Sequence, residues 1–309
     1  MSGSDPDVVL RTAGLTRRFG RLTAVADLDL EVSRGQVFGF LGPNGAGKTT
    51  TIGMILGLLR PTAGHVEMFG LDTRVHLRPA LRRTGAIVES PSFYPHLSGR
   101  DNLRVFALLS GGAEDKRLDE VLALVGLGER AGSKVRTYSL GMRQRLGIAA
   151  ALVHDPDLVV LDEPTNGLDP AGMREIRQLI KELGQMGKTV FVSSHLLNEV
   201  EQMCDHVGIL KAGRLLTQGF VSDMLQRGQA LEMEVTDEDG AVRVLEGLDW
   251  VDAVKRQDGR LIVDAPHERA AELSKALAER QIYLSELRPR EGTLEEFFLE
   301  VTGEVEAGE

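Results

Sequence analysis

The sequence predicts an α/β protein whose core is a parallel sheet, followed by a second, smaller domain. Continuous apolar runs, which are typical of parallel strands covered by helices on both faces, recur along the chain. The first run is followed by a glycine-rich loop and then by the pattern of a helix. Beyond residue 228, short strands and helices alternate in an order that differs from that of the preceding residues. The continuous apolar runs are at residues 37–41, 158–161 and 189–192.

The spacing of apolar residues predicts the other elements of the first domain, which we expect to span residues 8–227. Residues 8–32 alternate short apolar and polar stretches, which predicts a small antiparallel sheet. Helices are expected at residues 48–59 and 171–186, and a helical subdomain at about residues 91–152. One face of this subdomain has apolar residues spaced i, i+3, i+4 and i+7, at Leu118, Val121, Leu122 and Val125.

The second domain, expected at residues 230–303, has the order β-α-β-β-α-β, which predicts a ferredoxin-like α+β sheet. Its strands are expected at residues 231–235, 251–256, 261–263 and 282–287, and its helices at residues 241–248 and 268–280. A last helix has one apolar face, formed by Leu294, Phe297, Phe298 and Val301. This face must pack against other residues, most simply those of its own domain.

Composition narrows the class of protein. A chain of 309 residues, 42% hydrophobic and 27% charged, has an ordinary globular balance and room for two domains. The formal net charge of −10 argues against nucleic acid as a partner, because binding it requires a basic face. The single cysteine, Cys204, fits a reducing compartment. With neither a signal peptide nor an apolar run long enough to span a membrane, a cytoplasmic protein is expected.

A phosphate-binding loop is expected at residues 42–49, GPNGAGKT, which match G-x-x-x-x-G-K-S/T between an expected strand and helix. Glycines allow successive backbone N–H groups to surround phosphate oxygens, and the helix N-terminus adds positive potential. We expect Lys48 to contact the β- and γ-phosphates of ATP and Thr49 to bind Mg²⁺. The alternative is a glycine-rich turn with an exposed lysine. The candidate nucleotide-binding residues are Gly42, Pro43, Asn44, Gly45, Ala46, Gly47, Lys48, Thr49 and Thr50.

Two carboxylates, Asp162 and Glu163, follow the apolar run at residues 158–161. Ligands of open α/β sheets bind at the carboxyl ends of the strands. Asp162 is therefore expected to hold Mg²⁺, directly or through water, and Glu163 to polarise a water for attack on the γ-phosphate. The alternative is a solvated strand end, which is less compatible with a phosphate-binding loop upstream.

These motifs, in this order, resemble those of the ABC ATPase family, and the resemblance covers about residues 8–227. It implies that Phe19 stacks on adenine, for which the alternative is a place in the core. Residues 166–169, NGLD, resemble the family's D-loop, and this adds Asp169 to the nucleotide site. Residues 193–195, SSH, resemble its switch segment, whose histidine, here His195, contacts the γ-phosphate. A lone histidine after a strand is otherwise more often structural.

The family's signature motif, L-S-G-G-Q, has three candidates here. The segments at Ser98 and at Ser110 spell it better, but they lie far upstream of Asp162. The segment YSLGMRQR at residues 138–145 lies just before the expected strand and opens an amphipathic helix, so the resemblance assigns the role to Ser139 and Gly141. These residues would face the γ-phosphate of ATP held by another cassette, which implies a homodimer or a heterodimer.

Two departures from the common pattern point to a subgroup. The signature is altered, and Glu89 stands where most members have a glutamine that contacts the metal. Both variants, with the segment EGTLEEFF at residues 291–298, resemble bacterial exporters of antibiotics and lantibiotics. The resemblance implies an ATPase on the inner face of the cell membrane, docked on a separate membrane permease near Glu89, Phe93 and Tyr94. An import motor, or a soluble ATPase acting on ribosomes or DNA, is the alternative.

Overall fold

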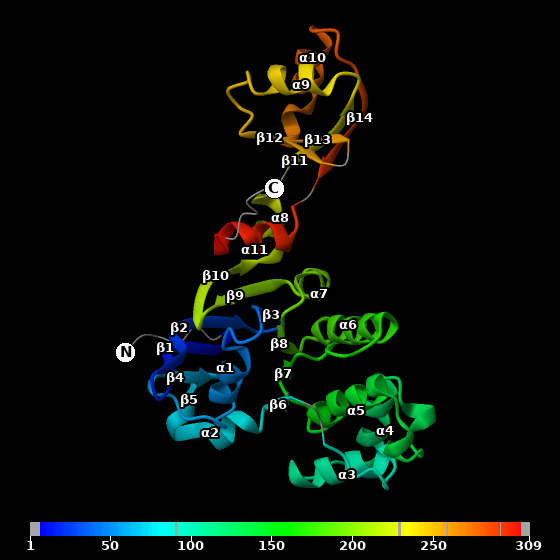
Figure 1. The fold of residues 1–309 in the computed structure, drawn as a ribbon. Coiled ribbons are helices and arrows are strands. Elements are labelled where there is room, and N and C mark those ends of the chain that lie inside the picture. Colours follow the sequence, from blue (N-terminus) through cyan, green and yellow to red (C-terminus); the bar gives the residue numbers. More distant parts are fainter. Residues whose placement is uncertain (1–6, 90–91, 228–229, 258, 291, 304–309) are drawn as a thin grey trace. The chain divides into compact units, whose positions relative to one another are not determined.

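The computed structural model describes residues 7–89, 92–227, 230–257, 259–290 and 292–303, and the chain divides into two compact units at Gly219/Phe220 (Figure 1). The sequence placed residues 220–227 with the first unit. The structure places them with the second, because α8 (Val221–Arg227) contacts α11 (Leu294–Thr302) and the Gly292 N–H donates to the Leu225 carbonyl at 3.2 Å.

The first unit is built around a six-stranded sheet in the order β10-β9-β3-β8-β7-β6. The pairs β9-β3, β3-β8, β8-β7 and β7-β6 are parallel. All three continuous apolar runs form strands of this sheet, as predicted. Phe38 and Phe40 pack on Phe191 in its core. The strands are β3 (Val37–Leu41), β6 (Thr84–Ile87), β7 (Leu158–Asp162), β8 (Thr189–Ser194), β9 (His206–Lys211) and β10 (Arg214–Phe220).

A second, antiparallel sheet lies in the same unit, with the order β2-β1-β4-β5. The antiparallel sheet expected at residues 8–32 is confirmed, and two strands from later in the chain extend it. Its apolar residues join those of β3 and of α1 (Lys48–Ile55) in one core. The strands are β1 (Val8–Phe19), β2 (Leu22–Ser33), β4 (Ala63–Met68) and β5 (Leu71–Asp72).

The helices that flank these sheets include α1 (Lys48–Ile55), α2 (Thr73–Leu81), α6 (Pro170–Gln185) and α7 (Leu197–Met203). The helix expected at residues 48–59 ends earlier than predicted. Leu56 caps it, and Gly57 has a φ of +70°, a conformation that glycine adopts without steric cost.

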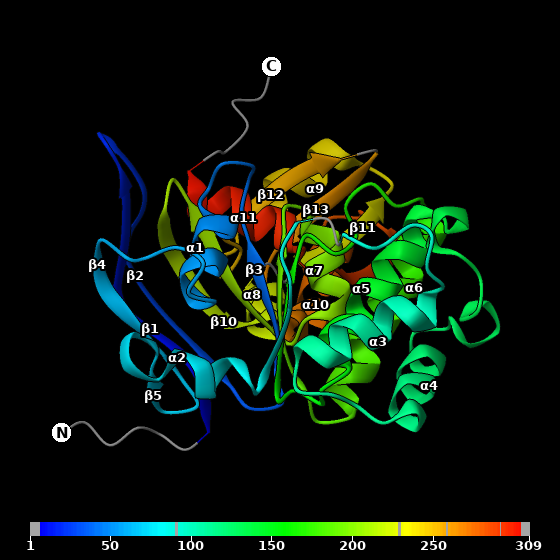
Figure 2. The same ribbon diagram turned by 90° about the horizontal axis from the view of Figure 1, so that it is seen from below.

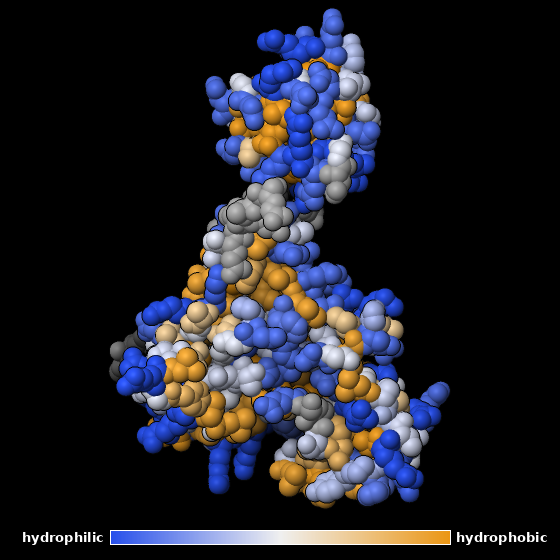
Figure 3. All heavy atoms as spheres, viewed as in Figure 1, coloured by the Kyte–Doolittle hydropathy of each residue, from blue (hydrophilic) through white to orange (hydrophobic). Residues whose placement is uncertain are grey.

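The expected helical subdomain contains α3 (Gly99–Leu109), α4 (Asp115–Leu124) and α5 (Leu140–Leu152), which lie together beside α6 in Figure 2. Its amphipathic face is buried as predicted, at Leu118, Val121, Leu122 and Val125. Apolar residues show on the surface over α3 in Figure 3, and its leucines Leu108 and Leu109 are among the most exposed large hydrophobic residues of the described chain.

The second unit contains the predicted ferredoxin-like sheet, with the order β12-β13-β11-β14 and antiparallel pairing throughout. α9 (Glu238–Leu245) and α10 (Ala270–Ala278) share an apolar core with it, and a 3₁₀ turn (His267–Arg269) forms the start of the helix expected from residue 268. The apolar face of α11 includes the buried residues Leu294 and Phe297. The strands are β11 (Ala230–Val235), β12 (Ala253–Gln257), β13 (Arg260–Asp264) and β14 (Leu284–Arg290).

No helix in the described part of the chain combines the length and the apolar character that a membrane span requires.

Candidate active site

The glycine-rich loop connects β3 to α1 in a conformation that its glycines make possible. Gly45 and Gly47 have φ values of +82° and +107°, which favour glycine. A Cβ atom at Gly47 would lie 2.6 Å from the Ala24 carbonyl oxygen, and one at Gly42 would lie 2.4 Å from that of Leu210. At Gly42 and Gly47 there is therefore room for backbone only, and the N–H groups of the loop and of the first turn of α1 form a cradle suited to phosphate.

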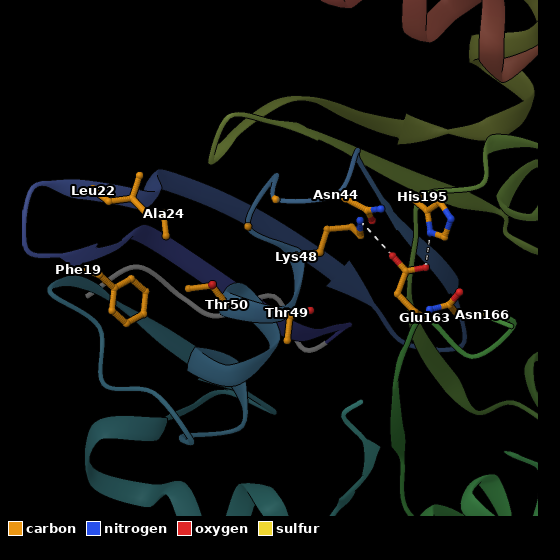
Figure 4. Close-up of a pocket in the computed structure, with 12 residues that line it drawn as sticks. Phe19, Leu22, Ala24, Asn44, Lys48, Thr49, Thr50, Glu163, Asn166 and His195 are labelled. Carbon is orange, nitrogen blue, oxygen red and sulfur yellow. Dashed lines mark hydrogen bonds and ion pairs between the residues drawn. The ribbon is translucent and has the colours of Figure 1, made fainter. Parts of the chain in front are cut away.

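Lys48, the first residue of α1, folds back over this loop. Its Nζ donates to the Gly42 carbonyl oxygen at 2.6 Å and lies 3.1 Å from Oε1 of Glu163 (Figure 4). The side chain is only 6% exposed. A nearly buried ammonium group needs negatively charged partners, which Glu163 supplies here and which phosphate oxygens also provide.

Glu163 follows β7 directly and connects two other segments of the site. Its Oε2 lies 2.8 Å from Nδ1 of His195, which follows β8, the strand next to β7. An ionised carboxylate only accepts hydrogen bonds, so in this contact Nδ1 is the donor. Glu163 has a φ of +48°, an uncommon conformation for a residue other than glycine and one that clusters at functional sites.

Asp162, the last residue of β7 and the neighbour of Glu163 in the chain, is nearly buried. It is 4% exposed, and its Oδ1 accepts a hydrogen bond from the Ser193 hydroxyl. Among the described residues, no group of three or more His, Cys, Asp or Glu side chains could hold a metal. The available ligands are the Asp162 carboxylate and the Thr49 hydroxyl, together with the phosphates that the loop would bind. This set fits Mg²⁺ better than a metal held entirely by protein side chains, because Mg²⁺ uses few protein ligands together with phosphate oxygens.

A pocket of about 470 Å³ joins the glycine-rich loop, Glu163 and His195, a volume in the range of small-molecule sites, and Asp162 is not among the residues that line it. Phe19 lies at one end, and Lys48, Glu163 and His195 lie at the other (Figure 4). The Arg17 guanidinium packs over the Phe19 ring at 4.4 Å. The pocket is lined by Phe19, Leu22, Ala24, Asn44, Gly45, Gly47, Lys48, Thr49, Thr50, Glu163, Asn166 and His195.

Three of these lining residues, Leu22, Ala24 and Asn166, were not among the residues proposed from the sequence. Leu22 and Ala24 belong to the start of β2, which has an ordinary strand pattern and no chemical signal. Asn166 lies in the segment that resembles the D-loop, and that resemblance is the only signal that could have indicated it.

Several expected site residues lie outside the pocket of this single chain. Ser139 is exposed and caps α5, where its hydroxyl accepts from the Met142 N–H at 3.2 Å, and Gly141 lies in the first turn. Asp169 caps α6 and accepts from the Gly172 N–H at 2.8 Å. Glu89 is exposed, with a φ of +59°. A role for these residues at the nucleotide therefore requires a second chain, or a bound ligand that reaches beyond the pocket.

Ser98 and Ser110, the other candidates for the signature serine, have local roles. Ser98 caps α3, where its hydroxyl accepts from the Asp101 N–H at 3.0 Å. Ser110 is the residue that ends the same helix.

Comparisons with known proteins agree with this fold and site. The ABC transporter family matches residues 25–166. The bacitracin transport ATP-binding protein BcrA of Bacillus licheniformis is 42% identical over 298 residues, 96% of this chain and 97% of that protein. The lantibiotic transport ATP-binding protein SrtF of Streptococcus pyogenes is 39% identical over 210 residues, 68% of this chain and 90% of that protein. A solved dimeric ATP-binding cassette with ADP and phosphate bound is similar, with a TM-score of 0.62 and 27% identity, covering 69% of this chain and 98% of that one.

The chain therefore belongs to the ABC transporter family. It is an ATP-binding subunit of that class and hydrolyses ATP. The family and the fold expected from the sequence are confirmed, while the roles of the individual residues stay predictions.

Proposed function

We propose that this chain drives export of a small amphipathic compound, of the antibiotic or lantibiotic type, through a separate membrane permease. The observation that carries its role as a motor is the contact of Lys48, Glu163 and His195 at one end of the pocket. The type of cargo is supported by the relatives, whose names concern transport of bacitracin and of a lantibiotic.

In this proposal the pocket orients ATP along its length. Phe19 stacks on adenine, and the amides of the loop surround the phosphates. Lys48 exchanges its contact with Glu163 for the β- and γ-phosphates, which frees the carboxylate. Glu163 then accepts a proton from the attacking water, while His195 holds the carboxylate through Nδ1 and reaches the γ-phosphate through its other nitrogen.

Mg²⁺ would be held by Thr49 and Asp162, with Glu89 as a third candidate, and would neutralise charge on the phosphate oxygens. Asp162 is suited to this role because it is nearly buried and is held by a hydrogen bond from Ser193. Thr49 is exposed toward the pocket and follows Lys48 at the start of α1.

A second cassette completes the site in the proposal. Ser139, Gly141 and Asp169 lie at the N-terminal ends of α5 and α6, where helix dipoles favour anions. Their position outside the pocket is consistent with a role at the nucleotide of a partner cassette, and a related cassette is dimeric with ADP and phosphate bound. The assembled pair would lie on the inner face of the membrane, against the permease.

Transport into inside-out membrane vesicles tests the direction and the cargo. Vesicles that contain this chain and its membrane permease should accumulate labelled bacitracin or a lantibiotic only when ATP is supplied. Vesicles with Glu163→Gln in place of the native chain should not. ATP-dependent movement of the compound in the opposite sense would contradict export, and ATP hydrolysis without movement of either compound would contradict the cargo.

A further inference from the structure

Ser193 connects the two neighbouring carboxylates of the active site through a single hydroxyl group. The hydroxyl donates to Oδ1 of Asp162 at 2.5 Å and accepts from the backbone N–H of Glu163 at 2.9 Å. The side chain is fully buried, and Asp162 and Ser193 are directly paired between β7 and β8.

The direction of both hydrogen bonds is determined by chemistry. An ionised carboxylate accepts only and a backbone N–H donates only, so the one hydroxyl proton of Ser193 must point at Asp162. The lone pairs of the Ser193 oxygen then accept the hydrogen bond from the Glu163 N–H. Bulk water does not reach either bond, because the hydroxyl is fully buried.

We propose that Ser193 is the positioning residue of the magnesium and hydrolysis sites: it directs the free oxygen of Asp162 toward Mg²⁺ and holds Glu163 in its left-handed backbone conformation. This inference rests on the function proposed above. Glu163 has a φ of +48°, and the Ser193 hydroxyl is a specific partner for its N–H in that conformation. Partners that orient metal ligands in this way affect metal affinity and activity by about 10- to 100-fold when removed.

The same strand offers a matched control, Thr189, at the opposite end of β8. Its side chain is equally buried, and its hydroxyl also accepts from a backbone N–H, that of Gly35 at 3.0 Å. Thr189→Val therefore removes a buried hydroxyl from β8 without touching either carboxylate.

The test measures equilibrium binding of a non-hydrolysable ATP analogue, with excess Mg²⁺ and with EDTA, alongside kcat and thermal unfolding of the full chain. In Ser193→Ala, affinity in EDTA should stay within about twofold, while the gain in affinity from Mg²⁺ and kcat should each fall by about 10- to 100-fold. Ser193→Thr, which keeps the hydroxyl, should restore both. Thr189→Val should leave both unchanged.

Two results would overturn the proposal. One is that Ser193→Ala, like Ser193→Thr, keeps the Mg²⁺ dependence and kcat of the native chain. The other is that Ser193→Thr loses as much of both as Ser193→Ala does. If Ser193→Ala does not fold, Ser193→Cys keeps the volume with a weaker donor, and native behaviour in that variant would also overturn it. Glu163→Gln in the same assays separates the two hypotheses: normal turnover there means that the catalytic role proposed above for Glu163 fails, whatever the result for Ser193.

Discussion

Glu163 and Glu232 each contact two basic side chains, yet only Glu163 lies in the active site. Glu163 contacts Lys48 at 3.1 Å and His195 at 2.8 Å and is 20% exposed. Glu232, in the ferredoxin-like unit, contacts Arg260 at 2.8 Å and Arg288 at 2.9 Å and is 15% exposed. Burial and ion pairing are therefore nearly equal at the two sites and do not by themselves indicate catalysis.

The difference lies in the backbone and in what surrounds each carboxylate. Glu232 is in the middle of β11, and its partners come from β13 and β14, the strands on either side. Hydrogen bonds from Arg288 and then Arg260 lower its pKa, so it remains a charged link between strands. Glu163 lies where a strand ends, has a positive φ and faces a pocket. An ion pair that faces a ligand site can exchange partners, whereas one that crosses a sheet is structural.

The largest expected effect tests this contrast directly. Glu163→Gln should bind ATP but lose hydrolysis by about 10²- to 10⁴-fold, because an amide cannot accept the proton of the attacking water. The variant should also accumulate as an ATP-bound dimer on size exclusion. Glu232→Gln, the matched control, should hydrolyse ATP at the native rate. Steady-state ATPase assays measure both, and near-normal turnover in Glu163→Gln would refute its role as the base.

Ser139→Arg should weaken ATP-driven dimerisation by at least about tenfold, or 1.4 kcal/mol, because a long side chain at the exposed start of α5 would occupy the place of the partner's phosphate. Binding of ATP to the monomer should not change. Ser110→Arg introduces the same side chain at the other candidate serine and should dimerise normally. Sedimentation with Mg-ATP measures the effect, and dimers of native affinity would contradict the assignment.

A chain that ends at residue 220 should fold and bind ATP within about tenfold of the full protein, because every residue that lines the pocket lies in the first unit. A chain that ends at residue 227 keeps α8 without α11 and should be less soluble, since it exposes an apolar face. Calorimetric titration with ATP and the soluble fraction of each chain test this. Aggregation of the shorter chain would show that the first unit depends on the second.

Glu89→Gln should leave Mg-ATP affinity within about tenfold, about 1.4 kcal/mol. The extra negative charge attracts Mg²⁺ and repels the phosphate, and at comparable distances these terms largely cancel. The rate of ATP hydrolysis and its stimulation by the permease should change, because an amide donates hydrogen bonds and a carboxylate does not. If Glu89 is only a solvated acid, Glu89→Gln and Glu89→Ala will both match the native chain in both measurements.

The smallest effect concerns pH. Burial lowers the pKa of His154, whose Nε2 lies 3.2 Å from the Thr84 carbonyl oxygen. A histidine with a lowered folded-state pKa contributes stability above its unfolded pKa of about 6.5, and this contribution is lost as pH falls through the folded-state value. The first unit should therefore lose stability between pH 7 and pH 5. His154→Gln, which can still donate to Thr84, should show a weaker pH dependence in calorimetry, and an unchanged one would contradict the prediction.

The sequence alone determined the family, the parallel core, the ferredoxin-like order and the phosphate-binding loop. These features depend on local patterns: continuous apolar strands, glycines at fixed offsets, and a lysine and a threonine at the start of a helix. Local patterns were less reliable at boundaries. α1 ends at Ile55 because Gly57 turns left-handed, and α8 groups with α11 because of a contact between segments about 70 residues apart.

Only the tertiary structure decided which side chains meet. Lys48, Glu163 and His195 come from three distant segments, and they converge because β3, β8 and β7 are neighbours and parallel, so their carboxyl ends share one edge. The link from Ser193 to Asp162 depends on the same register, since a shift of one residue in β8 would turn the hydroxyl to the opposite face of the sheet. Strand order and register are set by packing across the whole sheet, which no short segment of the sequence contains.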